Sequence, residues 1–138
     1  MELAIEQALR AAANEEIPVG AVIICDGEVV AEAHNKDIEL NDPTAHAEML
    51  AIRQACEKLG QQRLTNCDMY VTLEPCPMCC AATSFARIRR LYYGASDPKS
   101  GGIEHFNRPN CHHKPEIYDG INETECSQLM KGFFSTKR

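Results

Sequence analysis

The chain has 138 residues, 44% of them apolar and 25% charged, a size that suits one domain with one substantial core. Its 14 basic and 20 acidic residues give a formal net charge of −6, which argues against bulk, nonspecific nucleic-acid binding because such binding depends on neutralising phosphates. No apolar run reaches membrane-spanning length, and the N-terminus lacks the basic start and apolar stretch of a secretory signal. We therefore expect one domain over residues 1–138, in the cytoplasm and without a membrane partner.

Helix and strand signals alternate along the first half of the chain. Glu2–Ala13 is rich in Ala, Leu and Glu, with apolar residues at helical spacing, which predicts an amphipathic helix. The next expected elements are a strand over Val19–Cys25, a two-residue hairpin turn at Asp26-Gly27 and a return strand over Glu28–Ala33. A loop over Asn41–Thr44 then leads into a helix over Ala45–Leu59. Asp42 or Thr44 is expected to cap the start of this helix, and Gly60 to end it.

The second half continues this alternation. Its expected elements are a strand over Asp68–Leu73, a helix from Pro77 to about Ala86, a strand over Arg90–Tyr93, a mostly irregular stretch over Gly94–Lys114, a short edge strand over Pro115–Tyr118 and a closing helix over Asn122–Phe134. This order predicts an α/β fold, namely a three-layer α/β/α sandwich around a central mixed five-stranded sheet.

Eight cysteines are scattered among the expected helices and strands. In a chain that is not a tiny secreted scaffold, this distribution favours reduced thiols over a disulfide framework. Four of them are interpreted as small core residues: Cys25, Cys56, Cys67 and Cys126.

Two short motifs carry chemistry. They are His46-Ala47-Glu48 and Pro75-Cys76-Pro77-Met78-Cys79. His46, Cys76 and Cys79 have the chemistry of zinc ligands, and a catalytic zinc site takes three protein ligands with a fourth position left for water. Glu48 can carry protons beside such a site. The pattern matches the H-x-E and P-C-x-x-C signature of zinc deaminases.

The expected helices place these side chains at helix beginnings. His46 is expected in the first turn of one helix, with Cys76 and Cys79 at the entry and first turn of another. A helix N-terminus favours thiolate over thiol. Because residues two apart on a helix face different directions, His46 and Glu48 are expected to have separate roles, one as ligand and one as proton carrier.

Two other interpretations of the cysteines stay open. A structural zinc site would need a fourth ligand, and Cys111, His112 and His113 form a second small cluster that offers one, whereas Cys80 is badly spaced for it. A thioredoxin-like redox motif leaves His46 and Glu48 unexplained.

The chain resembles the cytidine-deaminase-like superfamily and, within it, the bacterial tRNA-specific adenosine deaminases. The stretches that carry the resemblance are Pro18–Val22, Asn35, Asn41–Met49, Tyr70–Cys79, Ala86–Arg90, Tyr93–Lys99 and Phe133-Phe134. One departure is that Gly101–His105 runs into Phe106–Pro109 sooner than in the family, through a deletion or an omitted loop. This departure leaves the zinc motif untouched.

The resemblance implies hydrolytic deamination of the wobble adenosine to inosine in a tRNA anticodon stem-loop, with one Zn²⁺ per subunit. It implies that Glu48 is catalytic and that Asn35, Val19, Ala47 and Asp97 contact the substrate. It also implies a homodimer, with the helix over Cys79–Arg89 as a candidate contact, and no DNA partner. A limited basic rim of Arg87, Arg89, Lys137 and Arg138 is a hypothesis for holding phosphates.

Two further functions are weighed against this one. A free nucleobase or nucleotide deaminase, acting on guanine or on cytosine and cytidine, would use the same zinc motif. A noncatalytic, zinc-stabilised partner subunit would be marked by loss of the proton carrier, and Glu48 is present.

Overall fold

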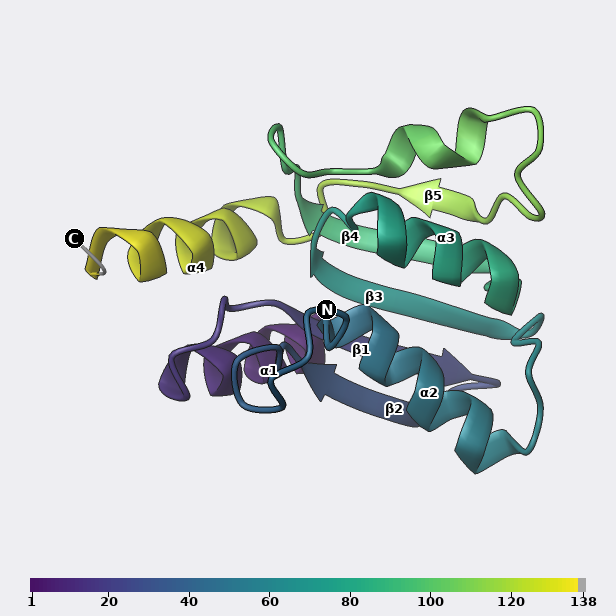
Figure 1. The fold of residues 1–138 in the computed structure, drawn as a ribbon, viewed down its shortest axis with the longest axis horizontal. Coiled ribbons are helices and arrows are strands. Elements are labelled where there is room, and N and C mark those ends of the chain that lie inside the picture. The colour runs from purple at the N-terminus through teal and green to yellow at the C-terminus, as the bar shows by residue number, and fades with distance from the viewer. Residues whose placement is uncertain (137–138) are drawn as a thin grey trace.

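A mixed five-stranded sheet forms the centre of the fold, with strand order β2-β1-β3-β4-β5 (Figure 1). The computed structural model describes residues 1–136. The strands are β1 (Gly20–Cys25), β2 (Glu28–His34), β3 (Cys67–Leu73), β4 (Arg90–Ala95) and β5 (Glu116–Tyr118). The helices are α1 (Glu2–Ala13), α2 (Ala47–Leu59), α3 (Pro77–Ala86) and α4 (Glu123–Thr136), together with the 3₁₀ helix η1 (Ile103–Asn107).

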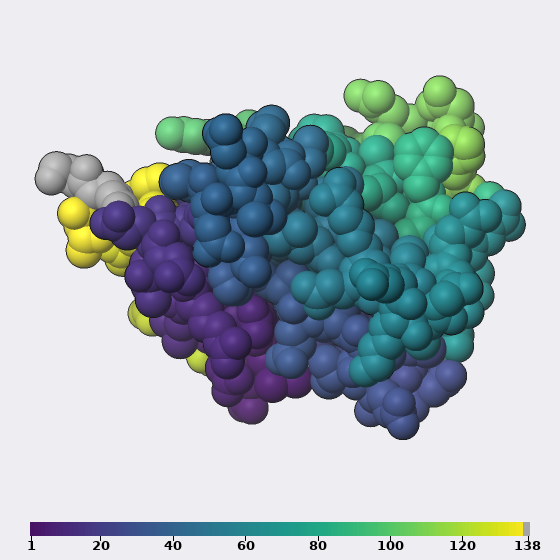
Figure 2. Space-filling view, turned by 60° about the horizontal axis from the view of Figure 1, so that its bottom comes forward, coloured from purple at the N-terminus to yellow at the C-terminus, as the bar shows by residue number. Residues whose placement is uncertain are grey.

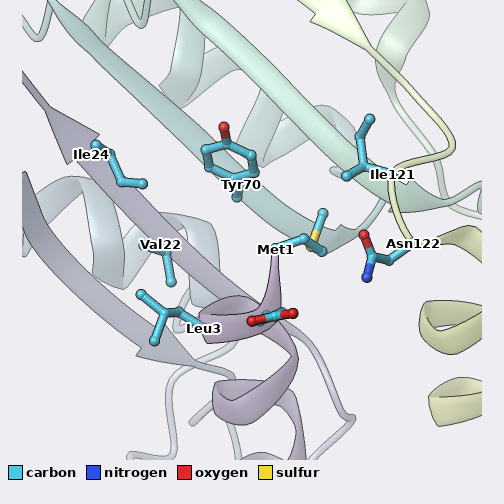
Figure 3. A pocket seen from close by; sticks show the side chains of 8 residues that line it. Met1, Leu3, Val22, Ile24, Tyr70, Ile121 and Asn122 are labelled. Carbon is cyan, nitrogen blue, oxygen red and sulfur yellow. The ribbon is translucent and has the colours of Figure 1, made fainter. Parts of the chain in front are cut away.

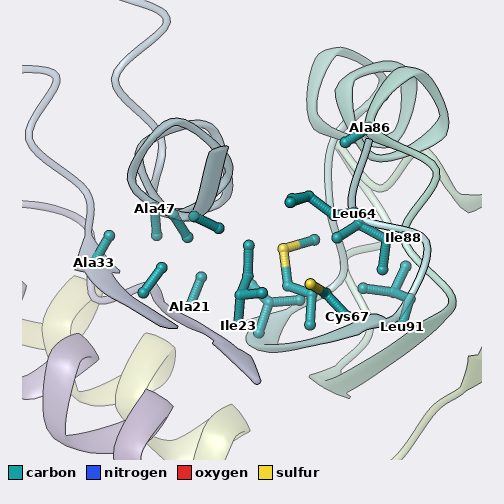
Figure 4. Close-up of a cluster of buried hydrophobic side chains, with 14 of the residues drawn as sticks. Ala21, Ile23, Ala33, Ala47, Leu64, Cys67, Ala86, Ile88 and Leu91 are labelled. Atoms are coloured by element: carbon teal, nitrogen blue, oxygen red, sulfur yellow. The ribbon is translucent and has the colours of Figure 1, made fainter. Parts of the chain in front are cut away.

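The sheet changes direction between its two halves. β1 pairs antiparallel with β2 and with β3, while β3, β4 and β5 run parallel. Helices α2 and α3 lie on one face of the sheet, and α1 and α4 lie on the other (Figure 4). The predicted three-layer sandwich around a mixed five-stranded sheet is therefore confirmed.

The main core lies between the sheet and the α2–α3 layer (Figure 4). Ala47, Ala51 and Ala55 follow one stripe of α2 and are fully buried, so their small side chains let the helix pack closely on the sheet. From the strands, Ile23 and Met69 fill the space beneath, also fully buried. This packing positions the N-terminal end of α2, where His46 and Glu48 lie.

Most expected elements are present, and the differences lie at their ends. Helix α2 begins at Ala47 rather than Ala45, because His46 is its extended N-cap residue, with φ −73° and ψ 152°. The helix ends as expected at Gly60, which has a left-handed φ of 65°. Within the stretch expected to be irregular, Gly94 and Ala95 continue β4, and Ala95 pairs with Leu73.

The connection between β2 and α2 packs beside the connection between α1 and β1. Figure 2 shows this blue segment standing against the purple N-terminal part of the chain. The Asn35 backbone N–H donates to the Val19 carbonyl across this contact. None of the helices in the described part of the chain is long and apolar enough to cross a membrane.

Candidate functional site

The two motifs meet where α2 and α3 begin. His46 is the N-cap of α2, Cys76 is the N-cap of α3, and Cys79 lies in the first turn of α3. The His46 Nδ1 atom is 3.6 Å from Cys76 Sγ and 3.5 Å from Cys79 Sγ. All three ligand atoms lie within 4.8 Å of one another. Cys76 and Cys79 occupy the expected helix positions, whereas His46 caps its helix rather than lying in the first turn.

These distances fit a tetrahedral zinc ion. Zinc–nitrogen and zinc–sulfur bonds of ordinary length, at a tetrahedral angle, place the two ligand atoms about 3.6 Å apart. The observed separations of 3.6 and 3.5 Å match this value. One imidazole and two thiols form the donor set, with no fourth His, Cys, Asp or Glu ligand in the group among residues 1–136. The residues therefore fit an ion with one coordination position left for water.

The second Cys/His cluster lies away from this group and has its own partners. His113 Nε2 is 2.9 Å from the Ile88 carbonyl, and the His112 ring packs against Phe85. Cys111 Sγ lies 3.4 Å from Ser84 Oγ. A four-ligand structural site that includes this cluster is therefore not formed in the described structure.

A hydrogen bond joins the two thiols and moves their pKa values in opposite directions. Cys79 donates a hydrogen bond to the Cys76 sulfur, which together with the His46 contact lowers the pKa of Cys76 to about 4. The same hydrogen bond raises the pKa of Cys79, and burial raises it further. The contact with Cys76 raises the pKa of His46. These shifts favour the thiolate form of Cys76, which is the form that binds a metal.

Glu48 lies one residue into α2 and only 4% of it is exposed. Burial is the main cause that raises the pKa of its carboxyl group to about 6. A carboxyl group with this pKa both accepts and releases protons near neutral pH. Its position beside the three ligand residues agrees with a proton carrier.

A cavity of about 400 Å³ opens over His46, Glu48 and Cys76. Its walls come from the α1–β1 connection, the β2–α2 connection, the end of β3, the segment after β4, and α4. This volume falls within the usual range for small-molecule pockets, about 300–1,000 Å³. Residues far apart in the chain thus enclose one space beside the candidate metal ligands.

Three of the four expected substrate contacts line this cavity: Val19, Asn35 and Asp97. The fourth, Ala47, does not, because its side chain is fully buried in the core. The Ala47 backbone N–H donates to Asn35 Oδ1 at 2.8 Å, which fixes the Asn35 amide. Asp97 Oδ1 accepts hydrogen bonds from the Lys99 and Ser100 N–H groups, so it shapes its own loop. The roles of all four toward substrate stay predictions.

Sequence reasoning missed the residues that join the two loops of the site. Glu74 accepts backbone hydrogen bonds from Asp97 at 3.1 Å and Ile103 at 3.4 Å. The Gly102 N–H donates to the Pro75 carbonyl at 2.7 Å. The available signals in the sequence were Glu74, just before the cysteine motif, and the Gly101-Gly102 pair. Neither signal indicates which residue it contacts in the fold.

The described part of the expected basic rim lies elsewhere. Arg89 pairs with Asp68 at 3.0 Å on the sheet, and neither Arg87 nor Arg89 lines the cavity. Lys99 does line it. The other two members of the expected rim, Lys137 and Arg138, lie outside the described residues.

Helix α4 closes the other side of the cavity. Met130 and Phe134 are four residues apart on this helix, so they lie on one face, and both line the cavity. The Phe133-Phe134 pair was noted in the sequence, whereas Met130 was not.

A second hollow, of about 420 Å³, lies near the chain start and is lined mainly by apolar residues and Tyr70 (Figure 3). It contains none of the candidate ligands. Of these two hollows, the first is therefore the one that holds candidate metal ligands, His46 and Cys76.

The comparisons with known proteins agree with this geometry. The model of the cytidine and deoxycytidylate deaminase zinc-binding region matches residues 1–95. A tRNA-specific adenosine deaminase of Agrobacterium fabrum is 55% identical over 142 aligned positions, covering 100% of this chain and 93% of the relative.

Two solved structures extend the comparison. One, from studies of A-to-I editing by tRNA:A34 deaminases at the wobble position of transfer RNA, superposes with a TM-score of 0.92 at 56% identity, covering 94% of this chain and 96% of that chain. A guanine deaminase from Bacillus subtilis has a TM-score of 0.69 at 31% identity, covering 99% and 90%. The chain belongs to the zinc-binding cytidine and deoxycytidylate deaminase family, and within it to the tRNA-specific adenosine deaminases.

Proposed function

We propose that this protein hydrolyses the wobble adenosine of a tRNA anticodon loop to inosine and releases ammonia. The observation that carries the chemistry is the cluster of His46, Cys76 and Cys79, of which His46 and Cys76 line the cavity together with buried Glu48. The substrate follows from the full-length similarity to a tRNA-specific adenosine deaminase. The proposed catalytic domain is the whole chain, residues 1–138.

His46, Cys76 and Cys79 would hold one zinc ion per subunit. When bound, zinc lowers the pKa of a coordinated water to about 7, so that a nucleophile is available near neutral pH. A Cys76 thiolate would attract a cation. The neighbouring N-terminus of α3 favours the deprotonated form of the cysteine ligands. His46 would bind through Nδ1, the atom that faces both sulfurs.

Glu48 would carry protons through the reaction. It would take one proton from the attacking water and deliver it to the ring nitrogen beside carbon 6 of adenine. It would then take the second proton of that water and pass it to the amino group, which leaves as ammonia. Its pKa of about 6 supports both directions of transfer. The net change is one water consumed and one ammonia released.

Asn35 and Val19 would hold the extruded base. The Asn35 Oδ1 atom is already bound to the Ala47 N–H, so the amide orientation is fixed and its NH₂ group can donate to an acceptor on the nucleotide. Val19 would offer an apolar contact to the ring. Asp97 would help to place the flanking backbone through the loop that it caps.

The proposed assembly is a cytoplasmic homodimer that binds the anticodon stem-loop and not DNA. Its candidate contact is the segment Cys79–Arg89, and Phe85 on this segment is 63% exposed, which supports an interface there. Sedimentation of the protein, with Phe85→Glu as the variant, tests the assembly. A monomeric wild-type protein would contradict this part of the proposal.

The direct test uses a synthetic anticodon stem-loop with adenosine at the wobble position, and the same loop with guanosine as control. Inosine and ammonia should form only from the adenosine loop, and Glu48→Gln should abolish both while keeping zinc bound. Free guanine and cytidine are tested in parallel.

The similarity to a guanine deaminase makes a free-base deaminase the second candidate. Turnover of a free base without turnover of the stem-loop would replace the tRNA proposal with this one. In that case the roles of the three ligands and Glu48 would be kept.

A further inference from the structure

Two cysteines face each other across neighbouring strands of the sheet. Cys25 is the last residue of β1 and Cys67 is the first residue of β3, and the register of these antiparallel strands places the two residues directly opposite each other. Residues in this relation project to the same face of a sheet. Both belong to the main core, where Figure 4 shows Cys67 on the side of the sheet that α2 and α3 cover. The two thiols therefore lie side by side at one end of the core.

The backbone of Cys25 is directed toward β2 and away from β3. Asp26-Gly27 is a two-residue hairpin turn, and Cys25 pairs with Glu28 across it. The two residues that flank such a turn exchange backbone hydrogen bonds with each other. The N–H and C=O groups of Cys25 are therefore engaged with β2.

The backbone of Cys67 is also directed away from this pair. Its N–H donates to the Leu64 carbonyl at 3.0 Å, and its carbonyl accepts from the Arg89 N–H at 2.9 Å. Cys25 and Cys67 thus form a non-hydrogen-bonded pair, the kind in which the two Cα atoms are about 4.5 Å apart and the side chains approach most closely.

This separation permits a disulfide bond. Disulfides join residues whose Cα atoms are about 4.4–6.8 Å apart, so a bond between these two sulfurs requires little movement of the backbone. Because the pair lies near the lower limit of that range, the bond would be strained, and strained disulfides are reduced easily. The geometry therefore suits a reversible bond rather than a permanent crosslink.

The two thiols differ in their access to solvent. Cys67 is fully buried, whereas Cys25 is 8% exposed beside the hairpin turn. Burial, followed by a hydrogen bond with Cys25, raises the pKa of Cys67 to about 12, so Cys67 stays a thiol at neutral pH. An oxidant in solution therefore reaches Cys25 first, with Cys67 beside it as the second thiol.

We propose that Cys25 and Cys67 form a reversible cross-strand disulfide when the protein is exposed to hydrogen peroxide. The Cys25 sulfur attacks one peroxide oxygen, the O–O bond breaks, and a sulfenic acid and one water are formed. The Cys67 sulfur then attacks the Cys25 sulfur, the S–O bond breaks, and the hydroxyl group leaves as a second water with the Cys67 proton. The two thiols together lose two electrons and two protons, which reduce one hydrogen peroxide to two waters. A dithiol reductant restores both thiols by thiol–disulfide exchange.

The bond would close a loop that carries part of the candidate metal site. Residues 25–67 include β2, the connection that follows it and α2, so His46 and Glu48 lie inside this loop. A disulfide stabilises a fold mainly by restricting the unfolded chain, and more so when the closed loop is long. For a loop of this length, the expected rise in the Tm of the oxidised protein is about 10 °C.

The experiment treats the zinc-loaded protein in native buffer with hydrogen peroxide. The remaining thiols are then blocked with N-ethylmaleimide in urea, and the digested protein is mapped by mass spectrometry without reduction. A linked pair of peptides that contain Cys25 and Cys67 is expected, together with the rise in Tm, and dithiothreitol should reverse both. Zinc content should not change, because neither cysteine belongs to the candidate ligand group.

Three variants complete the test. Cys25→Ser and Cys67→Ala each leave one thiol of the pair, so both should lack the linked peptide and the rise in Tm. Each variant is compared with its own reduced form, which separates the effect of the bond from any change in packing. Cys56→Ser is the matched control, because Cys56 is a half-buried thiol on α2 whose sulfur lies 3.9 Å from the Gln62 carbonyl oxygen. This control should respond to peroxide as the wild-type protein does.

Three results would overturn the proposal. One is a native protein that keeps both thiols after peroxide treatment and yields no linked peptide. Another is a link that forms only after unfolding in urea, because the pairing in the native sheet would then play no part. The third is oxidation of Cys25 to a sulfinic acid without a bond to Cys67.

Discussion

Glu48→Gln is expected to stabilise the metal-free protein while removing activity. Burial raises the pKa of this carboxyl group from 4.5 to about 6, so between these values the folded protein binds more protons than the unfolded chain. Its unfolding free energy therefore falls as pH rises through this window, and it stays lowered above it. At 1.36 kcal/mol for each pKa unit, the ionised carboxylate destabilises the fold by about 2 kcal/mol.

The neutral glutamine removes this penalty with nearly the same shape. Urea unfolding of zinc-stripped, reduced protein should show the variant more stable by about 2 kcal/mol at about pH 8 and equal to wild type at about pH 4. For 138 residues, at about 2.1 cal/mol/K per residue, the gain at high pH corresponds to about 7 °C in Tm. Glu57→Gln, an exposed change on the same helix, is the matched control and should have no effect. Equal stabilities of Glu48→Gln and wild type at about pH 8 would refute the reasoning from burial.

The remaining predictions concern the metal and the loops that carry its ligands. Gly102→Ala should weaken zinc binding, because a Cβ at this position would lie 2.6 Å from the Cys76 carbonyl carbon and from the Pro77 Cα; chelator competition measures this, and unaltered affinity would contradict it. Cys76→Ser should lose zinc on dialysis against a chelator, as metal analysis can show, while Cys56→Ser, which changes a half-buried thiol distant from the ligands in sequence, should retain it. Chelation of wild-type protein should abolish deamination and added zinc should restore it; activity that survives complete zinc removal would exclude the proposed metal role.

The sequence was sufficient to predict the layer order and to single out the three candidate ligand residues, because both rest on patterns that extend over only a few residues. His46, Cys76 and Cys79 sit in short motifs at helix beginnings, where spacing and capping rules apply over a few residues. The interpretation of cysteines as core residues also holds for Cys67 and Cys126, which are buried with raised pKa values of about 12 and 11.

What the sequence could not supply depends on distant partners. Glu16 has no neighbour in sequence that reveals its two hydrogen bonds to a loop more than twenty residues away. Ala47 was expected beside the substrate from the family resemblance, yet helix geometry turns its methyl group into the core. The start of α2 was placed two residues early because an N-cap residue is extended while already accepting the first helical hydrogen bond.

The residues that line the cavity come from two parts of the chain, and α4 belongs to the second part. The three ligands and Glu48 all precede residue 80, inside the stretch over 1–95 that the deaminase zinc-binding region matches. Asp97, Lys99, Met130 and Phe134 complete the cavity from beyond that stretch. Recombination near residue 95 would therefore exchange one wall of the cavity, while the candidate zinc ligands, Glu48 and the wall that carries Val19 and Asn35 are inherited together.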